Sequence, residues 1–469
     1  MVTHMYLYQK FRNSSLDTST LGLYCGSDIS DSVYTPTGYR ILGWTGNAGV
    51  HFCQITGFGD AVFAVDPSAP PGDCVHPVAK TLTDFIRLIH DCRSAEIVYR
   101  TYQWSRSRFE AAVNAIRPDY KMSSVLRALD NIYHPGPIVD AYSYITQLQQ
   151  NFDYNSLPLH PDYFEWCPVR PGAPRWDVGM NSAFGDYCDK NDAGTELNVN
   201  REFSWQGETW CVPAVYLCEN GIVVDSYLMV SPGKLSQYQE KWGTTTALSV
   251  EDEMRRQLED PLKMDAVGKL IVNGKEAPRR PLHSIIWNPS TENSWQARRT
   301  LEHYGLSREY GYLLRREIFL RKSNNPPIRN MDLLLCAEPV SIPGQRFIAP
   351  KNGEFMDFTH PVTGENHTMT ILSQTRESLN HNYMSNDPCC YTRLNFTVDP
   401  PINRELLSVV DCDEAEGAVN LNALRSSGKL SGAGHNGVSS LRYTPAEQIT
   451  WRMIFKLKTR PDMSIPLLP

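Results

Sequence analysis

The stretch that decides the fold consists of Val50-His-Phe-Cys-Gln-Ile55, Gly57-Phe-Gly-Asp60, Ala61-Val-Phe-Ala-Val65 and the segment from Leu82 to Cys92. The two short apolar runs are typical of strands, and the glycines between them favour a tight turn. After a Pro/Gly loop that extends to Val78, apolar residues recur at helical spacing, at Leu82, Phe85, Ile86, Ile89 and Cys92. The stretch therefore predicts a strand hairpin followed by a helix that packs on it.

Further helices and a second hairpin are predicted downstream. Ser105 can cap a helix that ends before Pro118, and apolar residues at helical spacing continue through 122–132 and 138–152. The Pro-rich segment 157–176 predicts a linker or an irregular surface loop. Asn220-Gly221 lies between two apolar runs, which is a strong hairpin signal. Pro213 within the first run predicts an edge strand or a bulge.

The last two hundred residues show mainly strand periodicity. The clearest alternation of apolar and polar residues is at Trp451, Met453, Phe455 and Leu457. Such alternation indicates one buried and one solvated face, as in antiparallel sheets. We predict an α+β protein in which an N-terminal mixed sheet-and-helix module precedes mainly antiparallel β domains of β-sandwich type. The predicted domains are 1–118, then 119–254 with helices, the Pro-rich loop and the hairpin, and the sheet-rich 255–469.

Composition places the chain among globular proteins and limits its partners. Of its 469 residues, 41% are hydrophobic and 21% are charged, and the formal net charge is −7. This acidic balance disfavours nonspecific binding to nucleic acid and to anionic membrane surfaces, because both need a basic footprint. Residues 251–329 contain four arginine pairs, which we interpret as a solvated face: Arg255-Arg256, Arg279-Arg280, Arg298-Arg299 and Arg315-Arg316.

The start of the sequence and the cysteines both favour a cytoplasmic location. Residues 1–10 lack the basic and apolar regions of a signal peptide, and no apolar run reaches the length of a membrane span. The twelve cysteines include no C-x-x-C pair and are interpreted as reduced thiols. Cys389 and Cys390 are adjacent, so their side chains should point to opposite faces and are poorly placed to share a metal. No cofactor is predicted.

Two clusters could carry chemistry. His360 and His367 flank a predicted turn at 361–364, so a hairpin could bring their imidazoles together, with Asp357 nearby as a carboxylate ligand for zinc or iron. Cys74 and His76 are two residues apart in the Pro/Gly loop, where an extended backbone would place them on one face as a nucleophile and base. Ordinary surface or loop residues would show the same patterns.

Four other residues are candidates for binding. Phe58 and Asp60 lie at the tip of the first hairpin turn, where turn geometry alone does not require them. Trp166 and Trp176 lie in the Pro-rich segment, where aromatic side chains either form a binding patch or attach the loop to the domain beneath. Gly432-Ala-Gly-His-Asn-Gly437 matches a dinucleotide fingerprint, but it lacks the flanking strand and helix and is interpreted as a loop.

The order of strand, Gly-containing turn, strand and the helix beginning Asp84-Phe85-Ile86 resembles the C-terminal half of the SMI1/KNR4-like (SUKH) superfamily over residues 40–115. The resemblance implies a binding module, often an intracellular immunity protein that neutralises toxins, and it carries over no catalytic residues. The whole chain also resembles a group of uncharacterised bacterial proteins with Gly-Phe-Gly-Asp, a Pro-rich loop, Val-His-Pro-Val and a sheet-rich second half.

Two hypotheses about function follow. The first is a noncatalytic intracellular protein that binds another protein. The second is a hydrolase that uses Asp357, His360 and His367 as metal ligands, or Cys74 and His76 as a dyad. The sequence lacks G-x-S-x-G, H-E-x-x-H and P-loop motifs, so the first hypothesis is favoured. The oligomeric state stays open.

Overall fold

A computed structural model of the protein describes most of the chain. The described residues are 8–11, 13–14, 16–25, 32–172, 176–185, 193–205, 207–243, 250–263, 266–322, 326–378, 390–412, 435–458 and 461–468.

Two compact units divide the chain. The first unit comprises residues 1–233 and 277–329, and the second comprises 234–276 and 330–467. The first unit is therefore discontinuous in sequence. The predicted boundary at 118 falls between two helices, α4 (Arg106–Ala115) and α5 (Tyr120–Tyr133), whose apolar side chains belong to the same core.

The first sheet of unit 1 contains the predicted hairpin. Its four antiparallel strands, in spatial order, are β1 (Tyr39–Trp44), β2 (His51–Ile55), β3 (Val62–Val65) and β4 (Val75–Ala79). Gly57 and Gly59 in the turn between β2 and β3 have φ angles of 97° and 64°, which glycine adopts without strain. Strand β4 was predicted as part of a loop. Its sequence is Val-His-Pro-Val-Ala, and the proline argued against a strand in the sequence. The strand lies at the sheet edge, where proline is tolerated.

Helices cover one face of this sheet. The predicted helix is confirmed as α2 (Leu82–Cys92), where Thr81 caps the first turn by accepting from the amide of Asp84. Ser105 caps α4 as predicted, by accepting from the amide of Arg108 at 3.0 Å. The remaining helices of this part are η1 (Thr18–Leu21), α3 (Ala95–Arg100), η2 (Thr101–Gln103), α4 (Arg106–Ala115), α5 (Tyr120–Tyr133) and α6 (Ala141–Gln150).

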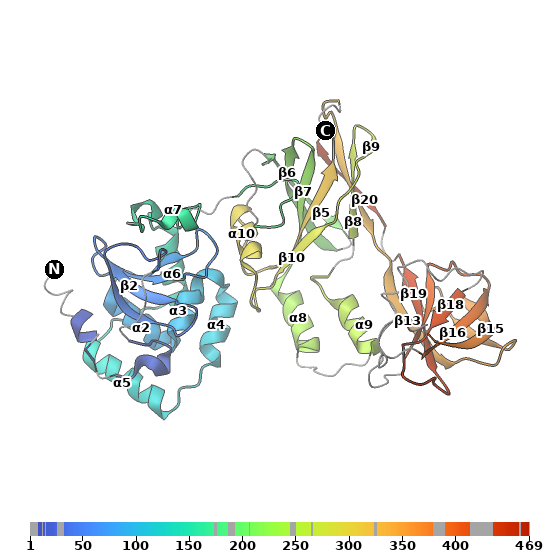
Figure 1. The fold of residues 1–469 in the computed structure, drawn as a ribbon, viewed down its shortest axis with the longest axis horizontal. Coiled ribbons are helices and arrows are strands. Elements are labelled where there is room, and N and C mark those ends of the chain that lie inside the picture. The colour runs from blue at the N-terminus through green and yellow to red at the C-terminus, as the bar shows by residue number, and fades with distance from the viewer. Residues whose placement is uncertain are drawn as a thin grey trace. The chain divides into compact units, whose positions relative to one another are not determined.

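The Pro-rich segment covers the opposite face. In β2 and β3 the side chains of Phe52 and Ala64 belong to the core shared with the helices, whereas Cys53 and Phe63 belong to a second core. That second core is completed by Leu157, Tyr163, Cys167 and Val169. Two short helices shape the segment: η3 (Tyr154–Ser156) and α7 (Tyr163–Trp166), the latter visible on the side of the sheet away from α2 (Figure 1). The predicted linker is therefore a structural layer.

The second sheet of unit 1 has five strands in the order β10, β11, β7, β6, β5. The hairpin predicted at Asn220-Gly221 joins β6 to β7, and the register shifts between Cys211 and Ala214, so Pro213 lies at a bulge as predicted. Helix α10 packs on this sheet through Ala297 and Leu301. The elements are β5 (Thr195–Trp205), β6 (Glu208–Cys218), β7 (Gly221–Val230), β10 (His283–Trp287), α10 (Trp295–His303) and β11 (Gly311–Leu320).

The described residues of unit 2 form two sheets and two helices. Four strands pair in the order β20, β12, β8, β9, and Asn273-Gly274 forms the turn between β8 and β9. The helices are α8 (Pro232–Trp242), which begins at the boundary between the units, and α9 (Val250–Glu259). The strands of the four-stranded sheet are β8 (Ala266–Val272), β9 (Lys275–Glu276), β12 (Met331–Ala337) and β20 (Met463–Leu468).

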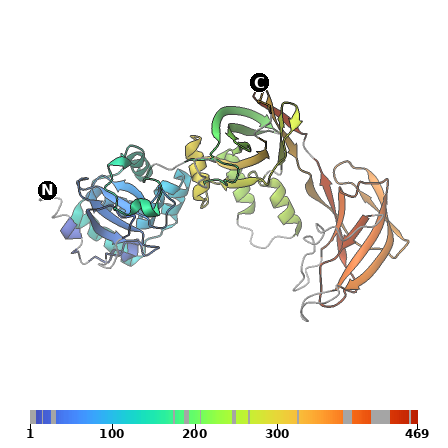
Figure 2. The ribbon, with the colours of Figure 1, turned by 45° about the horizontal axis from the view of Figure 1, so that its top comes forward.

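The seven-stranded sheet of unit 2 curls around one core (Figure 2). Gln345 on one edge strand donates to the carbonyl oxygen of Asp357 on the other edge strand, at 3.4 Å. The strands, in spatial order, are β13 (Val340–Ile348), β19 (Thr450–Leu457), β17 (Leu407–Asp411), β18 (His435–Val438), β16 (Cys390–Asp399), β15 (Asn366–Ser378) and β14 (Phe355–Thr359). The predicted α+β class with mainly antiparallel β-rich regions is confirmed.

Candidate functional site

A cavity of about 340 Å³ lies in unit 1, where four segments distant in sequence meet. They are the turn after β1, the loop after β3, the end of α3 with η2, and the first turn of α10. The volume is at the small end of the usual range for ligand pockets, about 300–1,000 Å³. It suits a small polar molecule or one or two side chains of a partner. The charged and aromatic lining residues are Asp66, Tyr99, Arg100, Tyr102, Trp295 and Arg298.

Asp66 provides a fixed carboxylate in the cavity wall. It follows the last residue of β3 and is 5% exposed. One carboxylate oxygen accepts from the amide and hydroxyl of Ser68 at 2.9 and 2.7 Å, and the other accepts from the Tyr99 hydroxyl. Burial raises the pKa of Tyr99, so this hydroxyl remains a donor. Three donors therefore hold the Asp66 carboxylate in one orientation.

Helix α10 places two arginines beside the cavity. Ser294 caps the helix by accepting from the amide of Ala297 at 3.2 Å. Ala297 and Leu301, one turn apart, are buried against the sheet, so the intervening Arg298 and Arg299 project elsewhere. Both arginines reach Asp73 in the loop between β3 and β4.

Arg298 is buried and ion-paired but retains a donor. It is 4% exposed, and its two terminal nitrogens donate to Asp73 and, at 2.7 Å, to Glu302. Although burial disfavours its charge, Glu302 and Asp73 raise the pKa of Arg298, so it remains a cation. Its Nε–H has no acceptor among the residues that the structure describes. A buried donor of this kind is costly unless a ligand or solvent satisfies it.

A stack of rings and one guanidinium supports the cavity wall. The guanidinium of Arg298 lies 5.3 Å from the Tyr102 ring centroid, and the ring of His76 stacks on Tyr102 at 4.0 Å. His76 Nδ1 lies 3.3 Å from the Tyr154 hydroxyl. Burial lowers the pKa of His76 to about 4, so its imidazole is neutral at physiological pH. Burial raises the pKa of Tyr102 to about 12.

These shifts decide what the cavity can do chemically. General acids and bases work best when their pKa is near the working pH. Tyr99, Tyr102 and His76 all have pKa values displaced away from neutrality. The arrangement therefore favours binding over proton transfer.

The predicted Cys74 and His76 dyad takes a different form in the structure. The Cys74 thiol hydrogen-bonds the Tyr163 hydroxyl at 3.2 Å, whereas His76 contacts Tyr154 and Tyr102. Burial raises the pKa of Cys74 to about 12, which keeps the thiol protonated and makes it a poor nucleophile. Both residues lie at or within β4 rather than in a free loop.

The predicted histidine pair does come together. The ring centroids of His360 and His367 are 6.2 Å apart, and both residues are buried. His367 stacks on Phe358, its cross-strand partner. Asp357, which precedes Phe358, therefore lies on the opposite face of the hairpin, where its carboxylate accepts from the Thr368 hydroxyl at 2.7 Å. Within the described residues, no group of three or more His, Cys, Asp or Glu side chains is arranged to hold a metal ion. The side-chain alternation of the strand therefore separates the carboxylate from the imidazoles.

Phe58 and Asp60 both have structural contacts in the first hairpin. Phe58 packs edge-on against Phe63 at 5.4 Å and also contacts Phe152. Asp60 is buried, and its carboxylate accepts from the Gln54 side chain at 2.9 Å. These contacts explain why the two residues occur at the turn, and a binding role for them stays a prediction.

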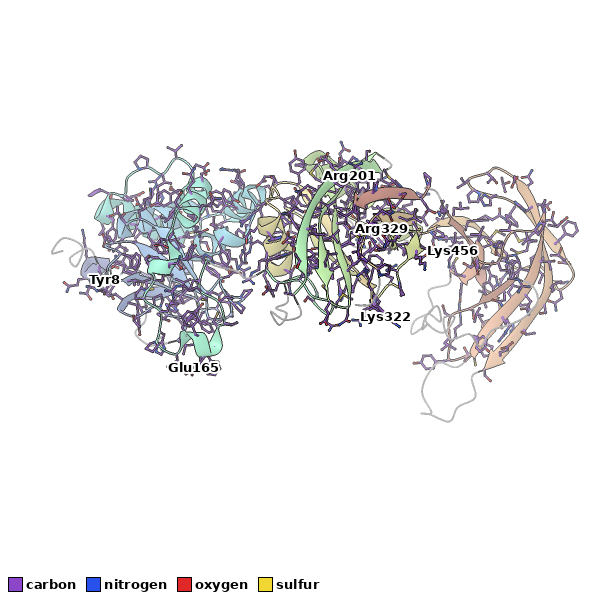
Figure 3. The ribbon with its side chains drawn as sticks, turned by 90° about the horizontal axis from the view of Figure 1, so that it is seen from above. Tyr8, Glu165, Arg201, Lys322, Arg329 and Lys456 are labelled. Atoms are coloured by element: carbon purple, nitrogen blue, oxygen red, sulfur yellow. The ribbon has the colours of Figure 1, made fainter. Side chains whose placement is uncertain are left out.

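The two candidate tryptophans lie in different environments. Trp166 on α7 is 67% exposed, and its neighbour Glu165 is labelled on the outer side of this segment in Figure 3. Trp176 stacks on His303 at 4.3 Å and donates to the Tyr216 hydroxyl at 2.9 Å. Trp176 therefore attaches its segment to the second sheet of unit 1, while Trp166 is available to a partner.

Two of the four arginine pairs are not part of a solvated face. Arg298, Arg299, Arg315 and Arg316 are all at most 4% exposed. Arg316 forms a bidentate ion pair with Asp225, its cross-strand neighbour in β7, and Arg315 contacts Glu317 at 3.3 Å. The prediction was wrong for these residues because their carboxylate partners come from other elements or from a strand with both faces covered.

Two predictions fall wholly or partly outside the described residues. Cys389 is outside them, as are residues 432–434 of the Gly-rich motif. The remainder of that motif forms β18, in which Gly437 pairs with Leu394. Gly437 lies so close to Val409 that a Cβ atom would be 3.2 Å from it. This glycine therefore serves close strand packing.

Sequence reasoning missed the cavity itself. Asp66 directly follows the predicted strand 61–65 and was not considered as a site residue, and Arg298 was interpreted as part of a solvated face. One local signal could have indicated that Arg298 is buried. Ala297 and Leu301 have the spacing of a packed helix face, and Arg298 immediately follows Ala297 beside that face. The partner Asp73 lies 225 residues away in the chain.

Comparisons with known proteins give no relatives. No protein-family model, curated protein or solved structure matches this chain. Among the described residues, the structure contains no helix with the length and apolar character needed to cross a membrane.

Proposed function

We propose that this chain is a noncatalytic cytoplasmic protein that binds another protein through the cavity of unit 1. The observation that carries the proposal is the composition of the cavity wall. Tyr99, Tyr102, Trp295, Arg100 and Arg298 all line it. Tyrosine, tryptophan and arginine are the residues that dominate the energetics of protein interfaces.

The wall is also held in place before any partner arrives. Tyr99 is hydrogen-bonded to Asp66, and Tyr102 stacks on His76 and lies 5.3 Å from the Arg298 guanidinium. Arg299 lies 4.9 Å from the ring centroid of Trp295. Ordering a flexible side chain on binding costs roughly 0.5–1.5 kcal/mol. A wall that is already ordered avoids much of this cost.

Two sequence features support the proposal independently of the cavity. The net charge of −7 disfavours nucleic acid as the partner. The resemblance of residues 40–115 to the SUKH superfamily implies a binding module, and these residues include most of the first sheet and the helices α2, α3 and α4.

The test compares two tryptophan substitutions in the full-length protein. Ala69 lines the cavity, so Ala69→Trp should fill it, whereas Ala111→Trp places the same side chain on the exposed face of α4. Proteins retained by each variant from native cells are quantified beside the wild type. We expect a protein that is retained by the wild type and by Ala111→Trp and lost with Ala69→Trp. Equal retention by all three proteins would contradict the proposal.

A further inference from the structure

We propose that Cys74 and Cys167 form a site of oxidative modification, at which a disulfide bond joins the start of β4 to the layer made by the Pro-rich segment. Cys74 immediately precedes β4, and Cys167 caps the end of α7. The two residues are far apart in sequence and come from two layers of unit 1. The site lies in the second core and does not depend on the cavity or its partner.

The two thiols meet at one tyrosine hydroxyl. The hydroxyl oxygen of Tyr163 lies 3.2 Å from the sulfur of Cys74 and 3.2 Å from the sulfur of Cys167. The two sulfurs are therefore at most twice that distance apart. Both cysteines are buried in the same core. The sulfurs of a disulfide are about 2.0 Å apart, so rotation of the two side chains, with a shift of the tyrosine, has to close the remaining gap.

The backbones on the two sides of the site are already in contact. The amide of Gly172 donates to the carbonyl oxygen of Gly72 at 2.8 Å. A Cβ atom on Gly72 would lie 3.4 Å from the Val169 side chain. Cys74 follows Gly72 by two residues, and Cys167 precedes Val169 by two residues. Disulfide formation needs such a close approach of backbones, because the bridged Cα atoms are usually about 4.4–6.8 Å apart.

Burial protects the two thiols while the layer is closed. Burial raises the pKa of Cys74 to about 12, with a contribution from the neighbouring Cys167 thiol. Because the thiolate is the attacking species, a buried protonated thiol reacts slowly. Reaction therefore begins when the Pro-rich segment opens locally and exposes a sulfur. Equilibration with an oxidant reaches the disulfide by this route even though the closed fold shields it.

The oxidant is a small organic disulfide, such as oxidised glutathione. The thiolate of one cysteine attacks it, forms a mixed disulfide and releases one small thiol. The thiolate of the other cysteine then attacks the protein sulfur of the mixed disulfide, which forms the bond between Cys74 and Cys167 and releases the second small thiol. Overall, the two protein thiols lose two electrons and two protons, and the small disulfide gains them.

A third thiol of the same core provides a matched control. Cys53 on β2 is buried, and burial raises its pKa to about 12. Burial is the sole cause of this shift, whereas a neighbouring thiol contributes to the shift of Cys74. Cys53 therefore tests burial without pairing. Cys25 is exposed and shows that the oxidant has acted.

The experiment equilibrates the full-length wild-type protein with mixtures of reduced and oxidised glutathione. Free thiols are then alkylated, and linked peptides are identified by mass spectrometry. We expect the peptide that links Cys74 to Cys167 to be at least about tenfold more abundant than any linked peptide that contains Cys53. Cys74→Ser should abolish the link, and Cys53→Ser should leave it unchanged. Because the wild type carries the main result, the outcome does not depend on the folding of a variant.

Hydrogen exchange provides a second readout, which measures whether the link holds the two layers together. In the oxidised wild type, the amides of 157–172 should exchange at least about tenfold more slowly than in the reduced protein, because the covalent link opposes local opening. In Cys74→Ser the two samples should exchange equally. The proposal is overturned if Cys25 becomes glutathionylated while no peptide links Cys74 to Cys167. Equal exchange in the oxidised and reduced wild type also overturns it.

Discussion

Two buried arginines of unit 1, Arg298 on α10 and Arg316 on β11, differ in how completely they are satisfied. Arg316 donates to both oxygens of Asp225 at 2.8 and 2.7 Å and to the carbonyl oxygen of Ala183 at 3.0 Å. Arg298 has two carboxylate partners, but its Nε–H has no acceptor among the described residues and it borders a cavity. Both are almost fully buried. The two arginines therefore differ in their hydrogen bonding and in the free volume beside them, and not in burial or charge.

The largest effect is expected when Arg316 loses its partner. Asp225→Asn leaves a buried guanidinium without a compensating charge, which typically costs about 3–5 kcal/mol in the free energy of unfolding. Denaturant unfolding of the full-length protein, with hydrogen exchange of β7 and β11 as the local readout, measures this loss. The control is Asp162→Asn at an exposed position, which should change the stability by less than about 0.5 kcal/mol. If Asp225→Asn lowers the free energy of unfolding by less than about 1 kcal/mol, Arg316 does not depend on Asp225 and the proposed difference from Arg298 is wrong.

The second prediction concerns the loss of stability at low pH. His76 stacks on Tyr102, whose ring centroid lies 5.3 Å from the Arg298 guanidinium. The pKa of His76 is lowered by burial from 6.5 to about 4, so the folded state favours the neutral imidazole. The stabilisation is present above pH 6.5 and is lost as the pH falls from 6.5 to about 4. At one pKa unit per 1.36 kcal/mol, the loss is about 3 kcal/mol at most.

The measurement is the unfolding free energy of the wild type and of His76→Phe between pH 7.5 and 4. Phenylalanine retains a ring against Tyr102 but does not titrate. We expect the wild type to lose more stability on acidification than His76→Phe does, and hydrogen exchange to accelerate in β4 before it does in β11. Parallel pH profiles of the two proteins would contradict the assignment of a neutral buried imidazole.

The smallest effect is expected at Asp73. Asp73→Asn removes a carboxylate shared by Arg298 and Arg299, yet Arg298 retains Glu302 and the adjoining cavity admits solvent. We expect a loss of about 2 kcal/mol, below the loss for Asp225→Asn, because partial compensation reduces the cost of an unpaired buried charge. The same unfolding series measures it. Equal losses for the two asparagine variants would show that the cavity does not relieve the charge on Arg298.

Local periodicity was sufficient to predict the elements whose residues are close in sequence. The β2–β3 hairpin, α2 with its apolar face, and the β6–β7 hairpin with the bulge at Pro213 all follow from spacing and turn chemistry within about twenty residues. The layer formed by the Pro-rich segment could not be predicted in this way, because Tyr163 and Leu157 become buried only against strands some hundred residues earlier in the chain.

The candidate site depended on contacts that local pattern does not encode. Arg298 and Arg299 were interpreted as solvated because nothing adjacent to them in the sequence neutralises both charges. Asp73 does so from the loop after β3. For His360 and His367 the hairpin was predicted correctly. The prediction also placed Asp357 beside them, whereas strand alternation directs Asp357 to the opposite face. Burial of charge is thus the property that single-sequence reasoning predicts worst in this chain.

The discontinuity of unit 1 has a consequence for the order of events during synthesis. Residues 277–329 supply β10, α10 and β11, and they follow the segment 234–276 that belongs to unit 2. Domains generally fold as units, and the N-terminal domain folds first as the chain emerges from the ribosome. Here the N-terminal unit is complete only after residue 329 has emerged. Until then Asp73 lacks its arginines and the cavity has no α10 wall, so the cavity is complete only in the later half of translation.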